Sequence, residues 1–108
     1  MNEDLLELIE ILGTRALQNS SRLSILIALY VLKKAIFSDI VRYTGQPKSS
    51  VYQSLQILED EGLVMVRYAI TFKGPRKVIE ITSKGEYLVE RLLELVSRLR
   101  TGGVAESR

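Results

Sequence analysis

Residues 46–64, QPKSSVYQSLQILEDEGLV, predict one amphipathic helix with a defined start and a defined end. Pro47 suits the first position of a helix, where its missing N–H costs no hydrogen bond. Gly62 suits the position after the last turn, because glycine adopts the left-handed backbone conformation without strain. We therefore expect a helix over residues 47–61, followed by an abrupt change of direction.

The predicted helix has one apolar face and one polar face. At 100° per residue, Val51, Leu55 and Leu58 share a face that can be buried. The side chains nearly opposite are polar or cationic: Lys48, Ser49, Tyr52, Gln53 and Gln56. Hydroxyl and amide groups form hydrogen bonds with base edges, and none of these residues carries the negative charge that DNA repels. This polar face is a candidate surface for nucleic acid.

The chain before this helix predicts three further helices. Residues 3–17 and 21–34 have apolar side chains at helical spacing, and the second segment is apolar enough to be buried. The stretch FSDIVRYTG, residues 37–45, predicts a helix of about two turns that ends at Gly45. A short helix, a tight turn and a second helix with a polar face follow the order of a helix-turn-helix unit.

After Gly62 the apolar pattern changes to an alternation. The stretch LVMVRYAITF, residues 63–72, predicts a strand with one face available for the core: Val64, Val66, Tyr68, Ile70 and Phe72. Gly74 and Pro75 predict a turn, and KVIEI, residues 77–81, predicts the returning strand. Residues 83–100 then predict a closing helix.

The chain has the length of one domain and a composition that excludes several kinds of site. We assign residues 1–100 to the domain and residues 101–108 to a flexible tail. The chain contains neither cysteine nor histidine, so disulfides, Cys/His metal sites and the usual nucleophile–base pairs are excluded. We expect no catalytic residue, no metal site, no cofactor and no enzyme activity. The absence of a long apolar run and the acidic, amphipathic start predict a cytoplasmic protein.

Positive charge gathers on the predicted hairpin, although the net charge of the chain is only +2. Four cations lie within residues 67–77: Arg67, Lys73, Arg76 and Lys77. Such a cluster favours contact with phosphates. Protection of an exposed strand edge is the alternative interpretation, because lysines commonly serve that purpose.

At these residues the chain resembles the winged-helix transcription regulators of the MarR, ArsR and PadR type. The resemblance covers about residues 20–98, and its most specific part is SLQILEDEGLV paired with ITSKG across a basic hairpin. It implies a mostly helical α+β fold, a winged helix-turn-helix with a two-stranded hairpin wing and long terminal helices. It also implies that helix 47–61 reads the major groove of double-stranded DNA, while wing 64–81 approaches the backbone or the minor groove.

The contacts carried over from the resemblance are ten residues: Lys48, Ser49, Ser50, Tyr52, Gln53, Gln56, Arg67, Lys73, Arg76 and Lys77. Because the recognition helix has no arginine, Lys48 would have to read guanine, or glutamine would read adenine instead. Several residues also have plainer interpretations. Tyr52 could pack against a neighbouring helix, Gln53 and Gln56 could be solvated, and the two serines could only start the helix.

The terminal helices predict a homodimer. Both carry more apolar residues than a small helical core with one hairpin can cover, which favours a self-complementary interface. The predicted contacts are Leu5, Leu8, Ile9, Leu12, Leu88, Leu92, Leu95, Val96 and Leu99. The alternative is that both helices pack within one chain. A cavity between these helices and the hairpin could hold a small-molecule effector, although no residue requires one.

The sequence predicts a homodimeric, sequence-specific regulator of transcription with no membrane partner, and it leaves two other functions open. One is a winged-helix protein–protein interaction module, since fold alone does not determine function. The other is an architectural DNA-binding protein with little sequence specificity.

Overall fold

The computed structural model describes the backbone of residues 1–106 and the side chains of residues 1–101. Its elements are α1 (Glu3–Leu12), α2 (Ser20–Leu32), β1 (Lys34–Ile36), α3 (Phe37–Thr44), α4 (Lys48–Asp60), β2 (Val64–Thr71), β3 (Gly74–Ile81) and α5 (Ser83–Glu106). The strands form one antiparallel sheet in the order β1-β3-β2. The predicted α+β class and winged helix-turn-helix architecture are confirmed.

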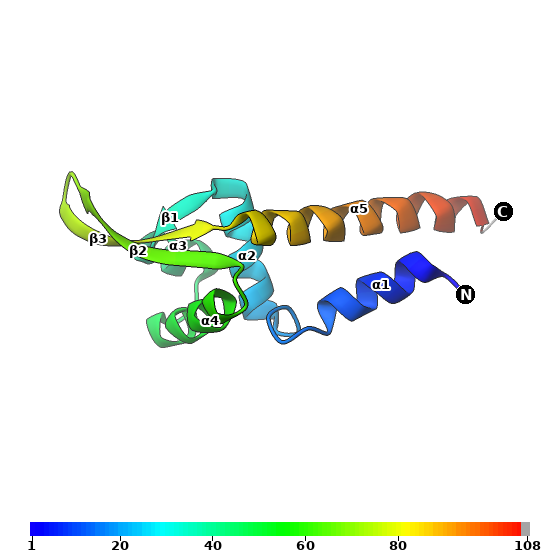
Figure 1. The fold of residues 1–108 in the computed structure, drawn as a ribbon, viewed down its shortest axis with the longest axis horizontal. Helices are drawn as coiled ribbons and strands as arrows, with labels where there is room; N and C mark the ends of the chain where they lie inside the picture. The colour runs from blue at the N-terminus through cyan, green and yellow to red at the C-terminus, as the bar shows by residue number, and fades with distance from the viewer. Residues whose placement is uncertain (107–108) are drawn as a thin grey trace.

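The molecule is elongated, with extents of 58 × 24 × 23 Å. Figure 1 shows the β2–β3 hairpin projecting at one end, while α1 and α5 run side by side toward the other. Between them, α2, α3 and α4 pack against the sheet. The hairpin and the paired terminal helices therefore extend from opposite ends of one small core.

Helices α2 and α4 each contribute several side chains to the core. Ile25, Leu26 and Leu29 of α2 are fully buried, as are Val51 and Leu58 of α4. These α4 residues lie on the face that the helical period predicts to be apolar. Burial of this face therefore turns the polar side of α4 outward.

The first helix is shorter than the predicted helix over residues 3–17: it ends at Leu12. Gly13 closes it, and the following loop carries Ala16 and Leu17 into the core outside any helix. Arg22 of α2 holds this loop: its Nε donates to the carbonyl of Ala16 at 3.1 Å and its Nη2 to that of Arg15 at 2.8 Å. Ala16 and Leu17, which continue the helical pattern in the sequence, thus lie in a loop and are buried in the core.

Strand β1 was not predicted. Lys33 ends α2 with a φ of 72° and turns the chain into Lys34–Ile36. This short strand pairs with β3, with Ile36 opposite Val78. Three residues are too few to show a period, so only pairing with a distant segment defines this strand.

The ends of two elements also differ from the prediction. The turn of the hairpin consists of residues 72–73, and Gly74 and Pro75 belong to β3. Helix α5 continues to Glu106, so most of the predicted tail 101–108 is helical. Residues 107–108 lie outside the described part of the chain.

A compact junction joins the end of α4 to the start of α5. The hydroxyl of Thr82 donates to the carbonyl of Gly62 at 2.6 Å and accepts from the amide of Gly85 at 3.0 Å. The amide of Thr82 also donates to the carbonyl of Leu63 at 3.0 Å. Gly62 has the left-handed φ of 76° that such a turn requires. This junction fixes the direction in which the hairpin leaves α4.

Candidate nucleic-acid interface

The polar face of α4 is presented to solvent. The side chains of Lys48, Ser49, Tyr52, Gln53 and Gln56 are exposed, and Ser50 is half-buried. Their position follows from the burial of the opposite face in the core and from the tight turn at Gly45, whose φ is 66°. The structure brings all six predicted α4 residues to one helix, five of them with open access to a ligand.

The turn before α4 is held by Gln46. Its Nε2 lies 3.5 Å from the carbonyl oxygen of Ser21 and 3.4 Å from the hydroxyl of Ser24, both on α2. Arg42 of α3 forms an ion pair with Asp39 on the same helix. The helix-turn-helix unit is therefore fastened to α2 at the point where α4 begins.

The four predicted wing cations do not form one patch. Arg67 of β2 forms an ion pair with Glu80 of β3, with 3.1 Å between Nη2 and Oε1. Lys73 and Arg76 have no carboxylate partner among residues 1–101, and Arg76 donates to the carbonyl of Pro75 at 2.8 Å. The charges of Lys73 and Arg76 remain available, whereas that of Arg67 is largely neutralised within the hairpin.

Lys77 lies on β3 of the wing, against α4. Its Nζ is 4.5 Å from the centroid of the Tyr52 ring and 5.8 Å from that of Phe37. A cation placed over an aromatic face is attracted by the ring quadrupole. The sequence could not reveal this contact, because 25 positions separate Tyr52 from Lys77 in the chain. It makes the polar face of α4 and the wing one continuous surface.

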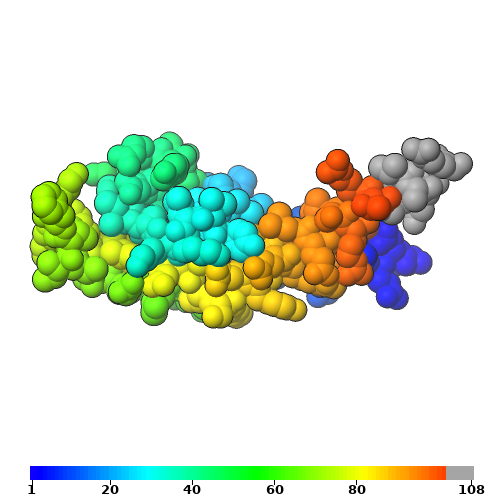
Figure 2. All heavy atoms as spheres, turned by 90° about the horizontal axis from the view of Figure 1, so that it is seen from above, coloured from blue at the N-terminus to red at the C-terminus, as the bar shows by residue number. Residues whose placement is uncertain are grey.

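A cleft of about 470 Å³ separates the wing tip from the start of α3. It is lined by Ile36, Ser38, Asp39, Arg42, Thr71, Phe72, Lys73 and Arg76. Figure 2 shows the hairpin end as an arm beside the bulk of the molecule. Three cations and one carboxylate, already paired with Arg42, give this cleft a net positive charge.

The residues predicted for a dimer interface divide into two groups. Leu92 and Leu95 are only 7% and 0% exposed within a single chain. Helices α1 and α5 pack together. Arg91 of α5 donates from Nε and from Nη2 to the carboxylate of Glu7 on α1, each at 2.7 Å. These hydrogen bonds hold the pKa of Glu7 below its ordinary value. Leu92 and Leu95 are therefore covered by their own chain, and their contact with a partner stays a prediction.

Other apolar residues of the terminal helices remain at the surface. Leu5, Ile9 and Val96 are about half exposed, whereas Leu8, Leu12, Leu88 and Leu99 have intermediate exposure. Leu6 and Leu93, which are not among the predicted dimer contacts, are exposed as well. We call Leu5, Leu6, Ile9, Leu93 and Val96 the stalk patch.

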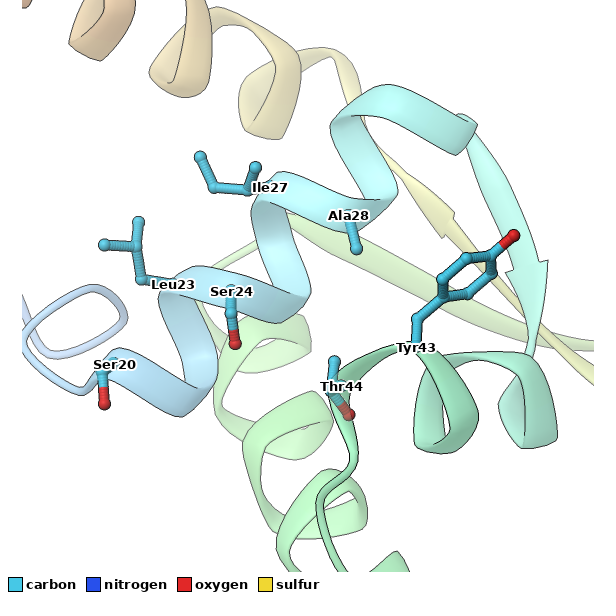
Figure 3. Close-up of a pocket in the computed structure, with 7 residues that line it drawn as sticks. All are labelled: Ser20, Leu23, Ser24, Ile27, Ala28, Tyr43 and Thr44. Atoms are coloured by element: carbon cyan, nitrogen blue, oxygen red, sulfur yellow. The ribbon is translucent and has the colours of Figure 1, made fainter.

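A separate open pocket of about 590 Å³ lies between α2 and α3 (Figure 3). Its lining is Ser20, Leu23, Ser24, Ile27, Ala28, Tyr43 and Thr44. The lining contains hydroxyl groups and apolar side chains but no charged group. The pocket differs in place from the expected cavity between the terminal helices and the hairpin.

Within residues 1–106, no helix is both long enough and apolar enough to cross a membrane. No curated protein matches the chain in sequence. The family model of a winged helix DNA-binding domain matches residues 21–99, most of the chain.

Solved structures add a similar protein of nearly the same length. A transcriptional regulator homologue from Pyrococcus horikoshii OT3 is 32% identical, with a TM-score of 0.77, and the match covers 94% of this chain and 97% of that one.

Two more distant structures show the same fold. A putative transcriptional regulator of the MarR family from Enterococcus faecalis V583 is 18% identical, with a TM-score of 0.73 over 100% of this chain and 96% of that one. MepR of S. aureus, in a complex with DNA, is 18% identical, with a TM-score of 0.72 over 97% and 82% of the two chains. The chain therefore belongs to the winged helix DNA-binding domain family and is a winged-helix transcriptional regulator.

Proposed function

We propose that the protein acts as a homodimer that binds a palindromic sequence in double-stranded DNA. In this proposal α4 of each protomer enters the major groove, and the wing contacts the flanking backbone or minor groove. The observation that carries the proposal is the exposed polar face of α4, which Lys77 joins to the wing over the ring of Tyr52.

The chemistry of α4 supports base recognition. Residues 46–58 include no carboxylate, so nothing on the first three turns repels phosphate. Gln53 and Gln56 each offer a donor and an acceptor that match N7 and N6 of adenine, and Lys48 can donate to guanine. Ser49 and Ser50, at the helix start, are placed for phosphate contacts. Each side chain then has a role that its chemistry allows.

The stalk patch supports dimerisation. Its five side chains expose apolar area on the paired helices α1 and α5, at the end of the molecule opposite the wing (Figure 1). A second copy related by a two-fold axis would cover this patch with the same patch of its own. Two recognition helices related by such an axis bind half-sites one DNA turn apart, roughly 34 Å.

Selection of bound duplexes from a random pool, at near-physiological salt, tests this function. A palindrome with half-sites about ten base pairs apart would support the dimeric regulator. Enrichment without a motif would instead indicate an architectural protein, and no retained DNA would indicate a protein-interaction module.

A variant pair makes the selection specific to α4. Replacing Gln53 and Gln56 with alanine should relax the preference at particular base pairs, each contact being worth about 1–3 kcal/mol. Gln18→Ala, an exposed glutamine in the loop after α1, is the matched control and should leave the motif unchanged. If the motif survives the double replacement, another face of the protein reads the DNA.

A further inference from the structure

The outer half of the wing exposes large apolar side chains in a row. Val64 is buried and Val66 half-buried, but the same face of β2 then continues outward with Tyr68 and Ile70, which are 76% and 88% exposed. Phe72, the next residue in this series, lies in the turn and is fully exposed. The face predicted to be available for the core therefore packs on it only as far as Val66. The hairpin carries this face past the edge of the core.

The strand register places Tyr68 and Ile70 on the side of the wing that meets α4, whereas Phe72, beyond the last paired residue, lines the cleft toward the start of α3. Tyr68 lies opposite Lys77 and Ile70 opposite Pro75. Paired residues share a face of a sheet, and Lys77 is the residue that stacks on Tyr52 of α4. Arg67 and Arg76 alternate to the other face. The side of the outer wing that continues the polar face of α4 is thus apolar and carries no phosphate-binding cation beyond Lys77.

Charge limits the partner that can cover this row. Between Arg67 and Ile79 the hairpin has no carboxylate, and Lys73 and Arg76 border the tip without an acidic partner among the described side chains. An exposed Phe at the end of a cationic arm fits an anionic surface with apolar recesses. The minor groove of duplex DNA has this character, because phosphates border it and deoxyribose and stacked bases line it.

The length of the wing fits the same partner. Phe72, at the tip of the wing, lies four residues beyond Tyr68, which pairs with Lys77. At roughly 3.3 Å per residue, this part of the wing is about 13 Å long. The major groove is about 12 Å wide. With α4 in that groove, the tip extends far enough to cross one backbone and reach the adjacent minor groove.

We propose that Phe72 is a wedge that enters the minor groove beside the half-site and partly unstacks one base step, bending the DNA. Tyr68 and Ile70 pack on the sugar walls, and Lys73 and Arg76 contact the bordering phosphates. Apolar side chains inserted in this way kink duplexes toward the major groove, at a cost that the added contacts repay. The inference rests on the proposed function, since it requires the protein to bind duplex DNA.

The test uses the full chain and the duplex obtained by selection. 2-Aminopurine is placed in turn at each step flanking the half-site, where its fluorescence rises on unstacking, and dyes at the two ends report bending by energy transfer. The wild-type protein should raise fluorescence at one flanking step and shorten the end-to-end distance. Phe72→Ser should abolish both signals and weaken binding about tenfold, while the bases read by α4 stay the same.

Two variants serve as controls. Phe72→Leu retains an apolar wedge and should restore most of the bend. Tyr87→Ser removes another exposed aromatic ring, from α5 and away from the wing, and should change neither signal. Because Phe72 is fully exposed, its replacement leaves the core packing intact and should leave the unfolding midpoint unchanged.

Distinct outcomes overturn the inference. Wild-type binding to the selected site without unstacking at any flanking step, or an equal bend with Phe72→Ser, would reject the wedge and leave the proposed function intact. A change in oligomeric mass with Phe72→Ser, without a change in bending, would assign the apolar row to a second copy of the chain instead. Failure of the wild-type protein to bind any duplex would reject both.

Discussion

The ammonium group of Lys77, on the wing, lies 4.5 Å from the ring centroid of Tyr52, on α4. This contact crosses from β3 to α4 and links the wing to the polar face of α4. Lys77 is half-buried there, so it acts first as a positioning residue for the two parts of the surface.

We expect Lys77 and Tyr52 to be coupled in stability. Lys77→Met keeps the aliphatic stem and removes the charge, and Tyr52→Leu removes the aromatic face. A double-mutant cycle in urea should give a coupling free energy of about 0.5–1 kcal/mol, the usual value for a partly exposed cation–π pair. Additive effects of the two replacements would contradict the interaction.

The salt dependence of DNA binding should depend on Lys73 and Arg76. Each phosphate that a cation neutralises adds about 0.9 to the steepness of log K against log salt. The double alanine variant removes four cations from the proposed dimer, so it should flatten the slope by roughly 3.6. Arg100→Ala, toward the end of α5, removes a control cation and should leave the slope unaltered. Equal slopes for the wild-type protein and the wing variant would remove the wing from the DNA interface.

The stalk patch should control the oligomeric state. Ile9→Glu places a charge in the proposed apolar interface, and light scattering should then report a monomer with little affinity for the full palindrome. Val31→Glu, on α2, charges an apolar residue that is even more exposed but lies outside the patch. A dimer that survives Ile9→Glu would show that the interface lies elsewhere.

Gly85 should be intolerant of any side chain. A Cβ atom there would lie 2.3 Å from the carbonyl oxygen of Leu63 and 2.7 Å from Cγ1 of Ile81. Gly85→Ala must therefore push α5 away from the junction, and we expect a loss of about 1–3 kcal/mol in urea unfolding. Ser83→Ala, exposed two residues earlier, should cost much less. An unchanged unfolding midpoint for Gly85→Ala would show that the junction has room for a methyl group, which would contradict the close packing of Gly85.

The packing of α1 on α5 should weaken in acid. Arg91 lowers the pKa of Glu7 below the ordinary 4.5, so the carboxylate is stabilised by folding. A group with a depressed folded pKa adds stability above its unfolded pKa, and that stability is lost as the pH falls through the folded value. Unfolding measured from pH 6 to pH 2 should show this loss in the wild-type protein, and Glu7→Gln should show less of it. If stability falls equally with pH in the two proteins, the pair of Glu7 and Arg91 does not cause the loss of stability in acid.

The sequence determined much of the fold, because helical and alternating periods depend on neighbours a few residues apart. The two faces of α4, the glycines at 45 and 62 and the hairpin followed by a long helix were all predictable in this way. So was the choice of Lys48, Tyr52, Gln53 and Gln56 as solvent-facing residues, since burial of Val51 and Leu58 leaves them no other side.

Only the tertiary structure decided which distant segments meet. The pairing of β1 with β3, the burial of Leu92 and Leu95 and the stacking of Lys77 on Tyr52 each join residues far apart in the chain. A local pattern shows that a side chain can be buried or that a cation is available. It does not show which partner will cover the side chain or hold the cation, because that depends on how the whole chain closes on its core.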